Sequence, residues 1–214
     1  MIQAVIFDMD GVLVDTEEYI CQAAIRFFDE NGLQVKAEDF LDFVGMGENR
    51  YIGGVAEKYN FPIEIHSAKT RVYEHYHDIV RGDLKPLPGV LKFINRCKSK
   101  NLKLAVATSA DKPKMLINLK ESGLSSEMFD TLVNGLDLKR LKPHPDIFLI
   151  AAERLDIPPE NCLVVEDAIS GVQAAKAAGC RCLGLMTTFS QEELALADWI
   201  SHTLEDAPEE VLEW

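Results

Sequence analysis

The sequence of 214 residues predicts an α/β protein with a doubly wound parallel sheet and an inserted helical block. The first observation is the short apolar run Ala4–Phe7, which is typical of a strand buried on both faces of a sheet. The second is that residues 16–82 show helical patterns and no convincing strand. The third is that short strands alternate with helices from Gly89 onward, which indicates a parallel sheet. We therefore expect a core domain of residues 1–15 and 83–214 around the insertion.

The inserted block begins with a helix whose first turn holds Glu17 and Glu18, where negative charge favours the helix N-terminus. Its apolar residues fall on one face, and Gly32 follows as a helix-ending glycine. Further helical stretches are expected at residues 37–44, 51–58 and 65–80. The stretch Gly82–Pro88 contains two prolines and is predicted to be the linker that leads out of the block.

The second half of the chain supplies the rest of the sheet. We expect strands at Lys103–Ala107, Thr131–Val133, Cys162–Val165 and Arg181–Leu185. The helices between them are predicted at Val90–Lys100, Pro113–Ser122, Asp146–Leu155 and Ala168–Ala178. Together with the first strand this gives five strands in a parallel, doubly wound arrangement.

Composition restricts the classes of function. The 35 acidic and 22 basic residues give a formal net charge of −13, which argues against nucleic acid and anionic membranes as partners. No transmembrane run is present, and a strand that begins by Gln3 leaves no room for a signal peptide. The five cysteines lack a C-x-x-C pair, so we expect buried thiols in a reducing compartment. These features predict a cytoplasmic protein, and we expect a monomer.

Polar side chains stand where the predicted strands end. Asp8 and Asp10 follow the first strand, and an isolated D-x-D-G of this kind is often only a polar turn. Later strand ends and turns add further polar groups, namely Thr108, Ser109, Lys142, Glu166 and Asp167. The carboxyl ends of parallel strands share one edge of the sheet, so these groups can converge. Their excess of carboxylates would repel unless a hard cation such as Mg²⁺ compensated them, and this combination suits phosphoryl transfer.

Four motifs, taken in order, resemble those of the haloacid dehalogenase superfamily. They are D-M-D-G-V at Asp8–Val12, V-A-T-S-A at Val106–Ala110, K-P-H-P-D-I-F at Lys142–Phe148 and V-V-E-D-A-I-S-G at Val164–Gly171. The similarity spans the whole chain and is greatest to the β-phosphoglucomutase-like phosphatases and mutases. It implies a Rossmann-like core, an α-helical cap formed by residues 16–82, and Mg²⁺ as cofactor.

The resemblance also implies roles for the acidic residues. Asp8 would be the nucleophile that forms an aspartyl-phosphate, and one of its oxygens would hold Mg²⁺. Asp10 would serve as general acid and then general base, and its backbone carbonyl would bind the metal. Asp167 would complete the metal site, with Glu166 ligating directly or through water. Finding Asp10 with both later acids argues against halide cleavage, because the halide-cleaving members lack the second aspartate and need no metal.

The remaining implied roles concern the phosphate. Thr108 would bind the transferring phosphoryl group, helped by backbone N–H groups near Ser109 and Ala110. Lys142 would neutralise charge on both nucleophile and phosphate, and Gly11 is assigned to substrate binding.

The sequence leaves two catalytic outcomes open, hydrolysis and mutase chemistry. Family mutases resemble this chain at Asp15–Tyr19 but carry a histidine next, where this chain has Ile20, which has no hydrogen-bonding side chain. Arg50, in the loop Gly45–Arg50, is a candidate substrate contact. We therefore predict a phosphatase acting on a small phosphorylated metabolite, such as a sugar phosphate. The alternatives are a β-phosphoglucomutase-type mutase and a non-catalytic binding protein. Lys112 and Lys114 are expected to form a surface face.

Overall fold

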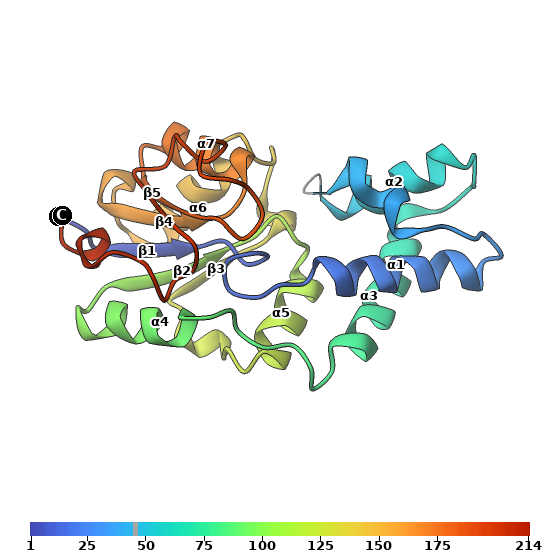
Figure 1. Ribbon diagram of the computed structural model, residues 1–214, viewed down its shortest axis with the longest axis horizontal. Helices are drawn as coiled ribbons and strands as arrows, with labels where there is room; N and C mark the ends of the chain where they lie inside the picture. The colour runs from blue at the N-terminus through green and yellow to red at the C-terminus, as the bar shows by residue number, and fades with distance from the viewer. Residues whose placement is uncertain (45–46) are drawn as a thin grey trace. The chain divides into compact units, whose positions relative to one another are not determined.

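The computed structural model describes residues 1–44 and 47–214, and it divides into two compact units (Figure 1). The larger, which we call the core unit, comprises Met1–Asp15 and Lys85–Trp214. The smaller, which we call the helical unit, is Thr16–Leu84. The expected division lay at the same first position and two residues earlier at the second. That the helical unit acts as a cap stays a prediction.

The core unit contains a six-stranded sheet in the order β3-β2-β1-β4-β5-β6, with every pairing parallel. Its strands are β1 (Ala4–Phe7), β2 (Lys103–Ala107), β3 (Thr131–Val133), β4 (Cys162–Glu166), β5 (Arg181–Leu185) and β6 (Trp199–Ser201). The sixth strand was missed by the sequence analysis. It has three residues, which is too short to show strand periodicity, and its pairing with β5 alone defines it.

The register of the sheet brings the predicted site residues level with one another. Phe7, the last residue of β1, lies opposite Val106 of β2 and Val165 of β4. The next backbone N–H, that of Asp8, donates to the Val165 carbonyl at 3.0 Å. Three neighbouring strands therefore end at one edge, as expected for a ligand site in an open parallel sheet.

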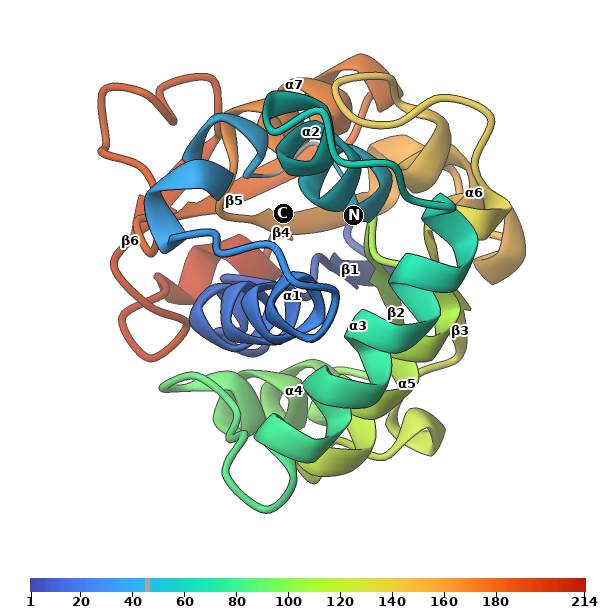
Figure 2. The same cartoon turned by 90° about the vertical axis from the view of Figure 1, so that its right-hand side faces the viewer.

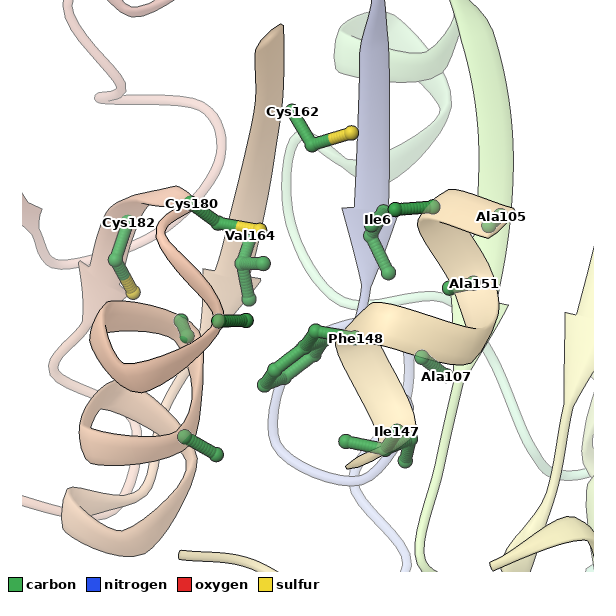
Figure 3. Packing of buried hydrophobic residues seen from close by; sticks show 14 of the residues in the cluster. Ile6, Ala105, Ala107, Ile147, Phe148, Ala151, Cys162, Val164, Cys180 and Cys182 are labelled. Atoms are coloured by element: carbon green, nitrogen blue, oxygen red, sulfur yellow. The ribbon is translucent and has the colours of Figure 1, made fainter. Parts of the chain in front are cut away.

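Helices cover both faces of this sheet, as Figures 1 and 2 show together. They are α4 (Val90–Ser99), α5 (Lys112–Glu121), α6 (Asp146–Leu155) and α7 (Ile169–Ala178). On one face, α6 and α7 pack against small and branched residues of β1, β2 and β4, such as Ile6 and Ala105 (Figure 3). On the other, the Phe7 ring meets Phe93 of α4 edge-on, with 6.1 Å between centroids. Successive side chains of β1 thus pack on opposite faces of the sheet, one against α6 and α7 and the next against α4.

The helical unit has its own aromatic core. It contains α1 (Glu17–Glu30), a 3₁₀ helix (Ala37–Phe43), α2 (Glu48–Lys58) and α3 (Ile65–Val80), without a strand among its described residues. Phe28 of α1 contacts Phe40 and Phe61, each with 6.2 Å between ring centroids. In residues 1–44 and 47–214, no helix combines the length and apolar character needed to cross a membrane.

Helix α6 offers a matched test of the core. Ile147 is fully buried in the α6–α7 layer, whereas Leu149 on the same helix is 40% exposed. We expect Ile147→Ala to lower the free energy of unfolding by about 2–5 kcal/mol, because it leaves a cavity in a close-packed layer. Leu149→Ala should cost less than about 1 kcal/mol. Urea denaturation followed by circular dichroism measures both, and equal losses would contradict the packing described here.

Candidate active site

The loop after β1 carries the first two predicted catalytic residues. Asp8 is buried, and the loop turns back on itself through hydrogen bonds from Leu13 and Val14 to the Met9 carbonyl at 2.9 and 3.1 Å. Gly11 adopts a φ of +78°, which an L side chain rarely allows. This tight turn holds Asp8 and Asp10 at the carboxyl edge of the sheet.

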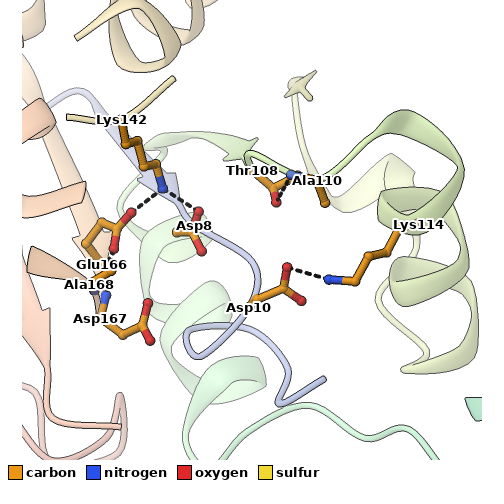
Figure 4. A network of polar contacts seen from close by, with 9 residues as sticks. All are labelled: Asp8, Asp10, Thr108, Ala110, Lys114, Lys142, Glu166, Asp167 and Ala168. Atoms are coloured by element: carbon orange, nitrogen blue, oxygen red, sulfur yellow. Dashed lines mark hydrogen bonds and ion pairs between the residues drawn. The ribbon is translucent and has the colours of Figure 1, made fainter. Parts of the chain in front are cut away.

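Lys142 connects the ends of β1 and β4. Its Nζ lies 2.6 Å from Asp8 Oδ1 and forms a second ion pair with Glu166 Oε1 (Figure 4). The Lys142 side chain is 9% exposed and its Nζ lies 5.3 Å from the centre of the Phe148 ring of α6. A buried cation with two carboxylate partners is fixed in position, as the prediction of a charge-neutralising lysine requires.

Glu166 is wholly buried and its oxygens are held by protein donors. Oε1 accepts from Lys142, and Oε2 accepts from the backbone N–H groups of Asp167 and Ala168, both at 2.9 Å. A Cβ added to Gly171 of α7 would overlap this carboxylate, so the helix can approach it only with glycine there. Glu166 therefore orients Lys142 in this structure, and its role as a metal ligand, directly or through water, stays a prediction.

The buried acids strongly affect one another. Burial raises the pKa of Asp8 to about 7, with Lys142 opposing the rise and the Glu166 charge adding to it. Burial, followed by the charges of Glu166 and Asp8, holds the pKa of Asp167 well above its ordinary value. Although burial alone would lower it, the pKa of Lys142 is raised by Asp8 and Glu166, so the lysine stays charged.

Asp167 approaches the β1 loop from β4. A Cβ on Gly11 would overlap the Asp167 carboxylate, so glycine is required at this position for space as well as for backbone conformation. The Thr188 hydroxyl donates to Asp167 Oδ2, and the hydroxyl of Thr187 donates to the Gly11 carbonyl at 2.6 Å. The two threonines after β5, which the sequence analysis missed, thus fix Asp167 and the loop. Adjacent hydroxyls after a core strand were the available signal.

Asp10 is held from the other side, by α5. Lys114 Nζ lies 2.7 Å from Asp10 Oδ2, and Asn118 Nδ2 lies 3.4 Å from Oδ1. The prediction that Lys114 belongs to a surface face is wrong, because only 5% of its side chain is exposed. The i, i+4 spacing of Lys114 and Asn118 indicated a shared helix face but not its partner.

The end of β2 contributes Thr108, which is buried and whose Oγ1 accepts from the Ala110 N–H at 3.1 Å. The Ala110 N–H donates to Thr108 in this structure, and its contact with a phosphate stays a prediction. Ser109 follows Thr108 at the sheet edge and is half-buried. Gly135, after β3, leaves no room for a Cβ beside the Ser109 carbonyl, which keeps this loop close.

Arg50 and Ile20 lie in the helical unit. Arg50 pairs with Glu57 of the same helix at 2.9 Å, with half of its side chain exposed, and its guanidinium lies 5.2 Å from the centre of the Phe43 ring. Ile20 is buried in α1. Residues 45 and 46 of the predicted substrate loop lie outside the described residues. A substrate contact by Arg50 stays a prediction.

The donor set at this edge fits a magnesium ion. Figure 4 shows the Asp8 and Asp167 side chains at this edge and the Asp10 carboxylate turned toward Lys114, and the buried acids exceed the charge of Lys142. Within the described residues no group of three or more His, Cys, Asp or Glu side chains meets the geometry of a metal cluster. Two carboxylates and a backbone carbonyl, supplemented by water, is nevertheless the sparse protein ligation that Mg²⁺ accepts.

Removing the shared cation tests this electrostatic account. We expect Lys142→Met in metal-free buffer to lower the free energy of unfolding by about 3–5 kcal/mol at pH 8, because Asp8 and Glu166 stay buried without their partner. The loss should shrink at pH 5. A carboxyl whose pKa is raised in the folded state binds a proton that the unfolded state has released, so stability falls as pH rises from about 4 toward 7.

Urea denaturation at the two pH values measures both effects. The control is Lys176→Met, which breaks a partly exposed pair with Asp198 and should cost about 0–1 kcal/mol at either pH. A pH-independent loss, or one no larger than that of the control, would contradict the assignment of Lys142.

Known proteins are similar to this chain in sequence and in fold. Residues 5–185 match the family model for haloacid dehalogenase-like hydrolases. The chain is 45% identical over 193 residues to SUPPRESSOR OF QUENCHING 1, a chloroplastic protein of Arabidopsis thaliana, covering 89% of this chain but only 18% of that protein. It is 37% identical over 177 residues to a phosphorylated carbohydrates phosphatase of Thermotoga maritima, covering 83% of this chain and 82% of the relative.

A solved structure extends the similarity to the whole fold. The crystal structure of CbbY from Rhodobacter sphaeroides in complex with phosphate is similar with a TM-score of 0.90, at 27% identity and with complete coverage of both chains. The family match spans Asp8, Thr108 and Glu166 at the strand ends and Lys142 in the turn before α6. The chain therefore belongs to the haloacid dehalogenase-like hydrolase family and is an enzyme of its group of phosphatases and phosphomutases.

Proposed function

We propose that this protein is a Mg²⁺-dependent phosphatase that hydrolyses a small phosphorylated metabolite, such as a sugar phosphate, through phospho-Asp8. The observation that carries the proposal is the buried Lys142 between Asp8 and Glu166, which leaves one nucleophile oriented beside a fixed cation. Phosphoryl transfer needs this arrangement, because its catalysis is mostly positioning and neutralisation of phosphate charge.

In the first half-reaction an Asp8 oxygen attacks phosphorus. The Asp8–phosphorus bond forms while the bond from phosphorus to the leaving oxygen breaks, and Asp10 gives its proton to that oxygen. Lys142 neutralises phosphate charge beside Asp8, and Thr108 donates its hydroxyl hydrogen to a phosphate oxygen. The Ala110 N–H that now donates to Thr108 leaves that hydroxyl hydrogen available.

In the second half-reaction Asp10 removes a proton from water. The resulting hydroxide attacks phosphorus, the Asp8–phosphorus bond breaks, and inorganic phosphate leaves. Asp10 lies two residues after Asp8 on the same loop, so its carboxyl stays near the phosphorus that Asp8 carries. The same side chain can therefore act as acid in the first half-reaction and as base in the second. Atoms and charges return to the starting state.

The residues proposed to hold Mg²⁺ are Asp8, the backbone carbonyl of Asp10, and Asp167. When bound, the ion would supply positive charge for phosphate oxygens and offset the repulsion between the buried acids. Thr188 and Gly11 keep Asp167 in place for this role. Glu166, which orients Lys142 and whose charge also acts on Asp8 and Asp167, would join this site directly or through water.

The substrate class rests on the relatives. The Thermotoga maritima relative is named a phosphorylated carbohydrates phosphatase, which supports a sugar phosphate for this chain. Ile20 offers no hydrogen bond where the mutases carry histidine, which favours hydrolysis. We propose that the helical unit acts as a cap that closes over the phosphate site and selects the leaving group, with Arg50 as a substrate contact.

The nucleophile is tested with Asp8→Asn. We expect phosphate release from p-nitrophenyl phosphate and a panel of sugar phosphates to require Mg²⁺ and to fall by roughly 10³-fold or more in the variant, since the amide does not form the covalent intermediate. Asp198→Asn, which alters a surface carboxylate, is the control. Comparable activity in native protein and Asp8→Asn would overturn the proposal.

The mutase outcome is separated with β-glucose 1-phosphate and a trace of the corresponding bisphosphate. A phosphatase releases inorganic phosphate from its substrates whether or not bisphosphate is present. Formation of the 6-phosphate isomer, dependent on bisphosphate and with little free phosphate, would replace the phosphatase proposal by a mutase.

Two glycines separate backbone strain from the metal site. Gly11 and Gly123 both have positive φ, +78° and +74°, but an added Cβ meets Asp167 at Gly11 and nothing within 4 Å at Gly123. Gly11→Ala should raise the Mg²⁺ concentration for half-maximal turnover by about 10-fold or more, because it displaces Asp167. Gly123→Ala should leave it unchanged while losing about 1 kcal/mol of stability. Equal Mg²⁺ dependence in the two variants would remove Asp167 from the proposed site.

A further inference from the structure

Helix α5 carries a charged side chain, Lys114, that contacts the site and has no role in the mechanism proposed above. Lys114 is 4% exposed and its Nζ lies 2.7 Å from Asp10 Oδ2. Burying an ammonium group without a partner costs free energy. The burial of Lys114 therefore favours its contact with Asp10 more strongly than burial would favour an exposed surface pair. Figure 4 shows the Lys114 side chain extending from α5 to the Asp10 carboxylate.

The second oxygen of Asp10 is approached from the same helix. Asn118 is 1% exposed, and its Nδ2 lies 3.4 Å from Asp10 Oδ1 and 3.2 Å from the Met9 sulfur. Lys114 and Asn118 are four residues apart, so they stand on one face of α5. One rigid helix therefore contacts both oxygens of a carboxylate that sits on a loop.

Asp10 itself is more exposed than its partners, with 35% of its side chain accessible. A loop carboxylate with this freedom would sample several rotamers in the absence of restraint. Proton transfer to a leaving oxygen requires a heavy-atom separation of about 2.6–3.2 Å, so the orientation of Asp10 decides whether it functions. The contacts from α5 restrict the positions that the Asp10 carboxylate can take.

We propose that Lys114, assisted by Asn118, is a positioning residue that aims the Asp10 carboxyl at the leaving oxygen. The inference rests on the proposed function and adds a residue to it. Lys114 makes and breaks no bond itself. In the step that it supports, the Asp10 O–H bond breaks and its proton passes to the leaving oxygen as the phosphorus–oxygen bond breaks.

The proposal has a consequence that a purely structural role lacks. A stable leaving group departs without a proton, whereas a basic one needs the proton from Asp10. Loss of Lys114 should therefore slow substrates in proportion to the basicity of their leaving group. Aryl phosphates offer such a series with nearly constant size, from p-nitrophenyl through p-chlorophenyl to phenyl phosphate.

The experiment compares kcat/KM across this series, with saturating Mg²⁺, for native protein, Lys114→Met and Lys114→Arg. We expect Lys114→Met to reduce kcat/KM for phenyl phosphate by roughly 10²-fold and for p-nitrophenyl phosphate by less than about threefold. The dependence of log kcat/KM on leaving-group pKa becomes steeper as a result. Lys114→Arg, which keeps the charge, should recover most of the native slope.

Two further variants complete the design. Lys120→Met alters a lysine of the same helix whose side chain is 74% exposed, and it should leave all rates unchanged. Asn118→Ala keeps Lys114, and it should reduce kcat/KM for phenyl phosphate by about fivefold more than for p-nitrophenyl phosphate. If Lys114→Met does not fold, as judged by circular dichroism, Asn118→Ala and Lys114→Arg still decide the question.

The outcomes distinguish this inference from the function on which it rests. An equal loss for all aryl phosphates, or an unchanged slope in both Lys114→Met and Asn118→Ala, would overturn the positioning role while leaving the phosphatase intact. Native protein without Asp8-dependent phosphate release would overturn the proposed function and this inference together.

Discussion

The structure depends on one buried interaction, the contact of Lys142 with Asp8 and Glu166. Two carboxylates at the ends of neighbouring core strands would repel strongly in the absence of a cation between them. Lys142 lies in the turn before α6, and the Asp167 and Ala168 backbone N–H groups donate hydrogen bonds to Oε2 of Glu166. Lys142 is thus held between two carboxylates and beside the Phe148 ring, and its contact with Asp8 restricts the position of that carboxylate.

The two acids of the β1 loop are attached to opposite neighbours. Asp8 is tied through Lys142 to β4, whereas Asp10 is tied through Lys114 to α5, which follows β2. The strand order places β2 and β4 on either side of β1. Asp8 and Asp10 are therefore only two residues apart in the sequence but contact groups on opposite sides of β1. Asp8 is buried and its pKa is raised, while Asp10 keeps access to solvent, so two acids of one loop have different surroundings.

The site costs stability. Asp8, Glu166 and Asp167 are all buried, and burial together with their mutual repulsion raises the pKa of Asp8 and Asp167. The surrounding layers of apolar side chains on both faces of β1 hold these acids together nonetheless. Two glycines, Gly11 and Gly171, provide the space in which Asp167 and Glu166 fit. A bound divalent cation would convert part of this repulsion into attraction, which is why the same cluster suits phosphate chemistry.

Local patterns in the sequence determined most of the fold. The bounds of β2 and α3 agree with those predicted, because buried runs and helical periodicity are properties of adjacent residues. The positions of Asp8, Thr108 and Glu166 at strand ends followed from the same patterns. The tertiary structure alone decided β6, which is defined by its pairing with β5, and the use of each oxygen of Glu166. It also decided the burial of Lys114. A lysine in a short helix is usually exposed, and no local pattern shows that its ammonium contacts Asp10, which lies 104 positions earlier.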